Sequence, residues 1–192
     1  MQASQESRKS LIIKATAEVL LEKGLLAART RDVTERSGVG TGLLNHYFRW
    51  SELRALAWSN IFDGLFGELD QGVGDPKATM DRFLSESFTP QADQIWQLWL
   101  EAIDLARSDG PMAQALEVAH KSQTDALTKV LEAGRLCNCW TLKDPSGTAI
   151  RLIALHDGLV GLILTSSADM DHATAARHLR FAFVLECATI LD

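Results

Sequence analysis

The stretch "SGVGTGLLNHYF", Ser37 to Phe48, has a composition that ordinary core or surface segments do not share. Three glycines occur within five residues, and two leucines, an amide, an imidazole, a phenol and a phenyl group follow them. Gly38 can adopt a positive φ in a tight turn, and Val39 can act as an apolar plug between two helices. Gly40 and Gly42 leave the start of the next helix without side-chain bulk. The pattern predicts a helix-turn-helix arrangement.

Helical periodicity extends in both directions from this turn, and the alternation typical of strands is nearly absent. Upstream, an amphipathic helix ends at Gly24, and Thr30 is the expected N-cap of a short second helix. The third helix covers about residues 41–47. Further helices are expected from Ser51 onward and at about 77–88, 91–107, 111–134, 146–167 and 172–190. The sequence therefore predicts an all-α fold of about nine helices.

The distribution of charge suggests two parts with different tasks. Residues 1–55 hold nine basic and six acidic residues, a net charge of +3, whereas the remainder holds ten and nineteen, a net charge of -9. The overall charge of -6 alone argues against a nucleic-acid binder. A basic first quarter on an acidic body instead suggests a small anion-binding surface. The segment "QGVGDPK", Gln71 to Lys77, breaks the helical pattern between the two parts.

No leader or membrane segment is expected. The most apolar run, from Leu152 to Leu164, is shorter than the roughly 20 residues that a membrane span needs. Three cysteines do not make a disulfide framework, which favours a reduced, cytoplasmic protein. Cys137 and Cys139 could be half of a metal site or a redox pair. Because no second Cys/His pair has zinc-ligand spacing, we expect two reduced thiols in a loop.

The stretch "TRDVTERSGVGTGLLNHYF", Thr30 to Phe48, preceded by "LLEKG", resembles the tetracycline-repressor (TetR) family of one-component regulators. The form "GTGLLNHYF" is most similar to the betaine-pathway (BetI-type) branch. Residues 95–102 ("IWQLWLEA") and 154–159 ("ALHDGL") also look like the C-terminal half of that branch. The sequence departs from the family pattern at Gly40, where a Ser N-cap is usual. It departs again at Ser51, where a phosphate-binding Lys is common.

The resemblance implies a homodimeric, ligand-responsive transcriptional regulator, which we expect to be a repressor released from a palindromic operator by an effector. It implies a helix-turn-helix DNA-binding domain at 1–50, a linking helix at 51–70, and a ligand-binding and dimerisation domain at 71–192. The expected partners are double-stranded DNA and a small organic effector. No cofactor, metal, membrane contact or enzymatic activity is expected. Two alternatives stay open: a cytoplasmic helical small-molecule-binding protein without DNA binding, and a helical enzyme.

The expected DNA contacts lie around the opening stretch. Asn45, His46 and Tyr47 can supply hydrogen bonds to phosphates or base edges, and Leu43 can touch a thymine methyl group. The full set of expected DNA-binding residues is Thr30, Arg31, Gly40, Thr41, Gly42, Leu43, Asn45, His46, Tyr47 and Ser51. The alternative for the same stretch is a glycine-rich helix connection with an aromatic core residue.

The helix expected at 91–107 is apolar around most of its circumference, which predicts burial on two sides. Trp96 and Trp99 project from nearly the same side, with Glu101 and Asp104 on the neighbouring stripe. Aromatic faces beside carboxylates suit a cation. We expect a small apolar or cationic effector contacted by Trp96, Trp99 and His120. The alternative is that both tryptophans are packed core and that the carboxylates face water.

The helices expected at 146–167 and 172–190 each offer two apolar faces. One face can be buried within the subunit, and the other can pair across a two-fold axis into a four-helix interface. The residues expected at this dimerisation interface are Leu159, Gly161, Phe183 and Cys187. The alternative is that both faces are covered within one chain.

Overall fold

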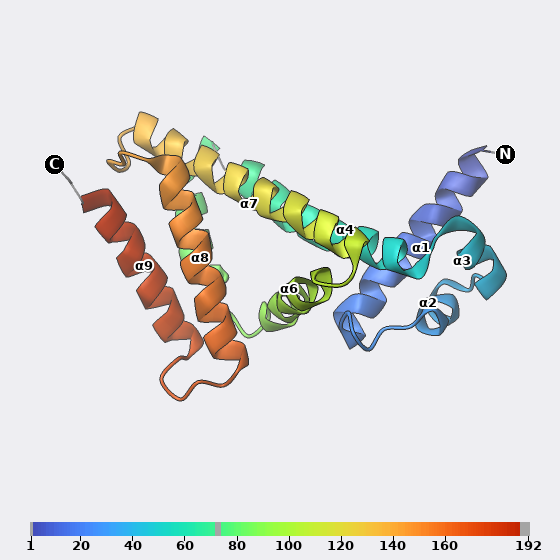
Figure 1. Ribbon diagram of the computed structural model, residues 1–192. Coiled ribbons are helices and arrows are strands. Elements are labelled where there is room, and N and C mark those ends of the chain that lie inside the picture. The colour runs from blue at the N-terminus through green and yellow to red at the C-terminus, as the bar shows by residue number, and fades with distance from the viewer. Residues whose placement is uncertain (1, 72–73, 189–192) are drawn as a thin grey trace. The chain divides into compact units, whose positions relative to one another are not determined.

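The computed structural model describes residues 2–71 and 74–188, and within these ranges it contains no strand. Its nine helices (Figure 1) are α1 (Gln2–Lys23), α2 (Thr30–Ser37), α3 (Thr41–Tyr47), α4 (Trp50–Gln71), α5 (Pro76–Glu86), α6 (Asp93–Ala106), α7 (Gly110–Leu136), α8 (Pro145–Leu164) and α9 (His172–Ala188). The all-α prediction is confirmed. The last two residues of the helix predicted at 172–190, and positions 72 and 73 of the predicted break, lie outside the described residues.

Contacts divide the chain into two compact units. The first unit contains the residues up to 64 together with 97–119, and the second contains 65–96 and the residues from 120 onward. The division runs through α4, α6 and α7, so each of these helices contributes one part to each unit. The domain boundaries at residues 50 and 70 stay predictions.

The first three helices pack around side chains with no solvent exposure: Ile12, Leu20, Leu25, Val33 and Leu44. Two glycines with positive φ end the first two helices. Gly24 has φ 80° and donates its N–H to the Leu20 carbonyl at 2.8 Å. Gly38 has φ 68° and donates to the Thr34 carbonyl at 3.1 Å. The predicted tight turn at Gly38 is confirmed, because a left-handed residue ends α2 there.

The start of α2 differs by one residue from the prediction. Arg29, not Thr30, is the N-cap, and its backbone N–H donates to the Asp32 carboxylate at 2.8 Å. Lys23 at the end of α1 donates to the same carboxylate at 2.6 Å. The Lys23 hydrogen bond, followed by that from Arg29, lowers the pKa of Asp32. The carboxylate therefore ties the end of α1 to the first turn of α2, where the helix dipole favours an anion.

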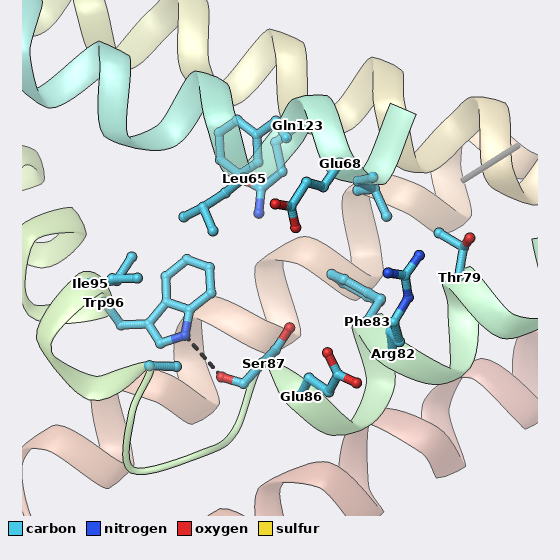
Figure 2. Close-up of a pocket in the computed structure, with 13 residues that line it drawn as sticks. Leu65, Glu68, Thr79, Arg82, Phe83, Glu86, Ser87, Ile95, Trp96 and Gln123 are labelled. Atoms are coloured by element: carbon cyan, nitrogen blue, oxygen red, sulfur yellow. Dashed lines mark hydrogen bonds between the residues drawn. The ribbon is translucent and has the colours of Figure 1, made fainter. Parts of the chain in front are cut away.

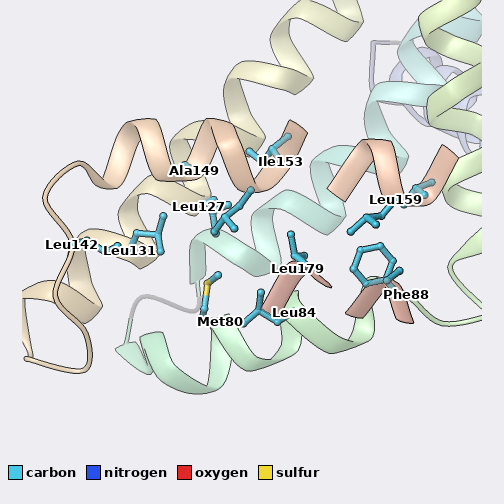
Figure 3. Packing of buried hydrophobic residues seen from close by; sticks show 13 residues of the cluster. Met80, Leu84, Phe88, Leu127, Leu131, Leu142, Ala149, Ile153, Leu159 and Leu179 are labelled. Atoms are coloured by element: carbon cyan, nitrogen blue, oxygen red, sulfur yellow. The ribbon is translucent and has the colours of Figure 1, made fainter. Parts of the chain in front are cut away.

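The second unit is built around an apolar cluster that α5, α7, α8 and α9 all enter (Figure 3). Leu127 and Leu131 from α7, Leu152 from α8 and Leu179 from α9 are all 1% exposed or less. α8 and α9 run side by side in this unit (Figure 1). Burial of several large aliphatic side chains supplies the main favourable term for folding of this part.

α5 and α8 both begin with an aspartate N-cap that is followed by a proline. Asp75 accepts the N–H of Ala78 at 3.0 Å before Pro76, and Asp144 accepts the N–H of Gly147 at 2.9 Å before Pro145. The proline sacrifices no hydrogen bond at the first helical position, because that N–H has no intrahelical acceptor. α8, the helix predicted at about 146–167, thus begins at Pro145, with Asp144 as its N-cap.

α8 is long and apolar enough, by length and composition alone, to cross a membrane. Core helices of soluble proteins share this property. Seven residues of α8 are buried, among them Leu152, His156 and Leu159. Its apolar character therefore fits a helix that packs inside the second unit.

Gly38→Ala should lower the free energy of unfolding by about 1 kcal/mol, because a Cβ atom disfavours the left-handed conformation. An added Cβ would have no heavy atom within 4 Å, so backbone strain is the only expected cause. Gly42→Ala is the matched control. It lies in α3 in equally open space and should raise stability by up to about 1 kcal/mol. Urea unfolding followed by circular dichroism measures both, and effects of the same sign would contradict the turn assignment.

Candidate functional site

The outward face of α3 carries most of the predicted DNA-binding residues. Leu44 is fully buried and fixes the helix against the first unit. Thr41, Gly42, Asn45 and His46 are exposed, and Leu43 and Tyr47 are half-buried. The burial of one leucine thus sets which side of this short helix faces outward. The contacts that these residues make with DNA stay predictions.

The glycines at the start of α3 are not explained by packing within the protein. A Cβ atom built on Gly40 or Gly42 would meet no heavy atom within 4 Å. The chain itself could therefore accommodate side chains at both positions. Bare backbone here is what a close approach to another molecule requires, which weakens the alternative of a purely structural glycine-rich connection.

Basic and hydroxyl side chains surround this face. Arg31 is exposed on α2, and its side chain makes an exposed ion pair with Glu35, at 2.7 Å. The Lys9 ammonium lies 5.9 Å from the ring centroid of Tyr47. The predicted residues Thr30 and Ser51 are half-buried, Thr30 in the first turn of α2 and Ser51 in that of α4. Solvated ion pairs such as that of Arg31 are weak, so the guanidinium can exchange its partner for a phosphate.

Trp99, a predicted ligand-binding residue, belongs to the core of the first unit. It is 1% exposed, stacks on Trp58 with ring centroids 5.5 Å apart, and lies 5.1 Å from Phe62. The Trp58 indole N–H donates to the Leu98 carbonyl at 3.2 Å. The expectation that Trp96 and Trp99 line one pocket is thus corrected. They are three residues apart on one helix, and the two ends of this helix enter different compact units.

Glu101, which we had expected beside a bound cation, instead holds a backbone turn. Its carboxylate accepts the N–H of Leu25 at 2.5 Å and the side-chain amide of Gln97 at 3.1 Å. A Cβ atom at Gly24 would lie 2.9 Å from one carboxylate oxygen, so a side chain there would displace this carboxylate, and the positive φ of 80° also favours glycine. Asp104 is exposed. Neither carboxylate lines the cavity described next.

A cavity of about 240 Å³ lies within the second unit (Figure 2). Its apolar wall includes Leu65, Phe66, Phe83, Ile95 and Trp96. The Trp96 indole N–H donates to the Ser87 carbonyl at 2.9 Å, which fixes the ring against the loop after α5. The buried side-chain oxygen of Gln123 also lines the cavity and has no hydrogen-bond partner among the described residues.

Charged groups stand at the exposed edge of this cavity. Glu68, Arg82 and Glu86 contribute to its lining, and all three are exposed (Figure 2). Their formal charges sum to one negative charge. An aromatic wall with an acidic edge is a setting that suits a cation better than an anion.

A buried histidine adjoins the cavity wall. The His156 ring is fully buried and lies 4.6 Å from Trp96, 5.1 Å from Phe88 and 5.9 Å from Phe83, measured between ring centroids. Its Nδ1 lies 3.1 Å from a carboxylate oxygen of Asp157. Its Nε2 is buried and has no partner in the described part of the chain. A buried polar atom without a partner is costly. His156 itself is not among the residues that line the cavity.

His120, the third predicted ligand-binding residue, is half-buried on α7 and is not among the residues that line the cavity. Of the three predictions, only Trp96 lines it. The sequence did contain a signal for His156, since a histidine and an aspartate interrupt the most apolar run of the chain. The ligand-binding role of Trp96 stays a prediction.

The predicted dimerisation residues mostly face their own subunit. Leu159 is 5% exposed within the apolar cluster, and Phe183 and Cys187 pack against that cluster. Phe183 also meets Trp140 edge-on at a centroid distance of 5.4 Å. Gly161 is half-buried, with open space beside an added Cβ. Leu159 thus fits the alternative of a face covered within one chain, because periodicity reveals two apolar faces but not which one is inside. The dimerisation roles of the half-buried Gly161, Phe183 and Cys187 stay predictions.

Another apolar surface remains exposed on the same two helices. On α8, exposed residues recur every four positions: Ile150, Ala154, Gly158 and Leu162. On α9 the exposed apolar residues are Phe181, Val184 and Leu185. Phe181 is 62% exposed and Ile150 is 57% exposed, although large apolar side chains are normally covered.

These features place the chain among helix-turn-helix regulators, in which a small helical head carries an exposed recognition helix and a larger helical body follows. Comparison with known proteins narrows the class. Residues 12–51 match the model of bacterial regulatory proteins of the tetR family, and residues 76–186 match that of the C-terminal part of BetI-type transcriptional repressors. The chain belongs to the TetR family and is a DNA-binding transcriptional regulator near the BetI type, as the resemblance implied.

Individual relatives agree with this assignment. The HTH-type transcriptional regulator PksA of Bacillus subtilis is 30% identical over 164 residues, covering 82% of this chain and 79% of PksA. The HTH-type transcriptional regulator BetI 1 of Chromohalobacter salexigens is 24% identical over 199 residues, covering 95% and 91%.

Solved structures share the fold. A TetR-family protein from Rhodococcus sp. has a TM-score of 0.77 at 22% identity and covers 95% of this chain and 100% of its own. A regulator from Saccharomonospora viridis, solved in complex with choline, has a TM-score of 0.75 at 18% identity and covers 92% and 95%.

Glu101→Ala should lower the free energy of unfolding by about 1–3 kcal/mol, because it removes a charged acceptor from the backbone N–H of Leu25. Asp104→Ala on the same helix is the control, since it is exposed and should change stability by less than about 0.5 kcal/mol. Urea unfolding of both variants tests the difference. Equal effects would show that Glu101 does not hold the turn after α1.

Proposed function

We propose that this TetR-family regulator is a cytoplasmic homodimeric repressor that leaves a palindromic operator when a small organic cation binds its second unit. The observation that carries the proposal is the exposed, polar face of α3, oriented by the burial of Leu44. The effector part rests on the cavity around Trp96. Ligand and operator would oppose each other because each stabilises a different arrangement of the same protein.

Within this proposal, α3 enters the major groove, and its side chains divide into two kinds. Thr41 and Asn45, exposed one turn apart, reach base edges and supply sequence preference. Tyr47, with Lys9 over its ring, meets the phosphate backbone, as do Arg31 and Ser51 on the flanking helices. Phosphate contacts fix the position of the head, and they make affinity depend strongly on salt.

Tyr47→Phe should weaken binding to all DNA sequences by a similar factor, because it removes one hydroxyl but keeps the ring beneath Lys9. Thr41→Ala should instead change the ranking of operator variants, by up to about 1–3 kcal/mol for one base pair. Fluorescence anisotropy over a series of salt concentrations measures both. A wild-type protein without salt-dependent DNA binding would support the alternative of a small-molecule-binding protein that does not bind DNA.

The proposed dimer uses the exposed apolar surface of α8 and α9. Gly158 and Ala154 leave room for a partner helix, and Leu162 and Phe181 supply apolar area beside them. A second copy of the chain is the proposed occupant, because a palindromic operator needs two heads related by a two-fold axis. Two helices from each copy then form an isologous four-helix interface.

Phe181→Glu should yield monomers that remain helical, because a charge would be introduced into the interface but not into the subunit core. Leu159→Glu should unfold the second unit, since Leu159 is 5% exposed within its cluster. Sedimentation and circular dichroism distinguish these outcomes at micromolar concentration. A Phe181→Glu protein that stays dimeric, or a monomeric wild type, would exclude the interface.

Four properties of the cavity and one related structure support a small cationic effector. Its volume of about 240 Å³ is small for a ligand pocket. Trp96 and Phe83 offer aromatic faces, and Glu68 and Glu86 outnumber Arg82 at its edge. The choline complex of the Saccharomonospora viridis protein shows that a protein with this fold can hold a quaternary ammonium compound. The unpartnered side-chain oxygen of Gln123 could accept a hydrogen bond from a ligand hydroxyl group.

Trp96→Leu should remove a preference for choline over its neutral carbon isostere, 3,3-dimethylbutan-1-ol. A desolvated cation–π contact is worth roughly 2 kcal/mol, so the wild type should prefer choline by about 30-fold. Calorimetric titration of both ligands into both proteins measures the difference. If the wild type binds the two compounds equally, the ammonium group is not recognised, whereas the DNA-binding assignment would be unaffected.

A further inference from the structure

The loop between α7 and α8 brings two thiols into direct contact. The sulfur atoms of Cys137 and Cys139 lie 2.8 Å apart, and both residues are exposed. A disulfide bond has a length of about 2.05 Å, so little movement separates this arrangement from a covalent one. Neither the effector cavity nor the α3 face includes this pair.

The chain holds the two thiols together through the turn that ends α7. Asn138 between them has φ 59°, a left-handed conformation that asparagine tolerates better than most residues. The Cys137 N–H donates to the Ala133 carbonyl at 3.0 Å, and the Cys139 N–H donates to the Gly134 carbonyl at 2.8 Å. The contact between the sulfurs is therefore a consequence of the fixed backbone, and the pair needs no partner subunit to form.

The two thiols are not equivalent. The hydrogen bond with Cys137 is the largest cause of a raised pKa at Cys139, followed by desolvation, while the charge of Lys77 acts in the opposite direction. Cys139 therefore keeps its proton to higher pH than an ordinary thiol does. The Cys137 thiol lies 3.4 Å from the Gly134 carbonyl and remains accessible to a small oxidant.

The next residue connects the loop to α9. The Trp140 indole N–H donates to the Leu131 carbonyl at 2.8 Å, and its ring meets Phe183 edge-on at 5.4 Å. The ring also lies so close to Gly134 that an added Cβ would sit 1.9 Å from it. A rearrangement of the backbone at Cys139 would therefore move this tightly packed indole ring.

We propose that Cys137 and Cys139 form a reversible disulfide when a hydroperoxide oxidises them, and that Trp140 transmits the change to Phe183 on α9. The Cys137 thiolate attacks the peroxide, an S–O bond forms, and the O–O bond breaks to give a sulfenic acid and an alcohol or water. The Cys139 thiol then attacks this sulfur, an S–S bond forms, and the S–O bond breaks with loss of water. Two thiols thus supply the two electrons that reduce the peroxide, and thiol–disulfide exchange with a dithiol reverses the reaction.

The chemical step is tested on the full-length reduced protein with equimolar hydrogen peroxide. Free thiols should fall from three to one per chain, the intact mass should fall by two hydrogen atoms, and dithiothreitol should restore both values. Cys187→Ser is the matched control and should lose both of its remaining thiols. Cys137→Ser and Cys139→Ser should form no internal disulfide. A mass gain of oxygen in the wild type, or a disulfide that contains Cys187 or joins two chains, would overturn the proposal.

The structural step is tested through tryptophan emission. Oxidation should shift the emission of the wild type, and the shift should be lost in Trp140→Phe although the disulfide still forms. Cys139→Ser, which keeps all five tryptophans, should show no shift with peroxide. An unchanged wild-type spectrum after complete disulfide formation, or a shift that persists in Trp140→Phe, would refute transmission through Trp140. None of these outcomes depends on the effector or on operator binding.

Discussion

The packing of Trp99 on Trp58 and Phe62 determines what the rest of α6 can do. Because the Trp99 ring packs in the core of the first unit, the C-terminal half of α6 belongs to that unit. Glu101 lies in this half and accepts the N–H of Leu25 in the turn after α1. The N-terminal half carries Trp96, whose indole is fixed at the cavity wall by a carbonyl. One helix therefore contributes to a packed core at one end and to a cavity wall at the other. A short sequence such as "IWQLWLEA" contains both roles because consecutive turns of a helix can enter different environments.

Much of the fold could be predicted because its signals are local. A glycine that ends α2 with positive φ and an Asp-Pro pair that starts α8 each act within one turn of helix, and both are visible in the sequence. The helical class and the family followed from such signals. The observed N-cap of α2, Arg29, lies one residue before the predicted one, Thr30. Asp32 accepts the backbone N–H of Arg29, and this interaction cannot be inferred from the residue types that are preferred at N-caps.

The candidate site was less predictable because it depends on which of two apolar faces turns inward. Leu159 and the exposed Leu162 both fit an apolar stripe, and only the tertiary packing distinguishes them. The same ambiguity led to the prediction that Trp99 lines a pocket, whereas its ring is packed in the core. The sequence shows His156 only as a polar residue within an apolar run, since its aromatic neighbours come from distant segments. Periodicity identifies candidates for burial, but contacts between distant segments decide their roles.

The volume of the cavity near Trp96 also implies a selection by size. A headgroup-sized molecule fits inside a space of about 240 Å³, whereas long acyl chains attached to the same headgroup would have to lie outside it. If the effector is an ammonium compound, membrane lipids that carry the identical group would leave those chains exposed to water. A regulator built this way would respond to the free metabolite, whose concentration changes with supply, and would ignore the far larger reservoir of that group held in membranes.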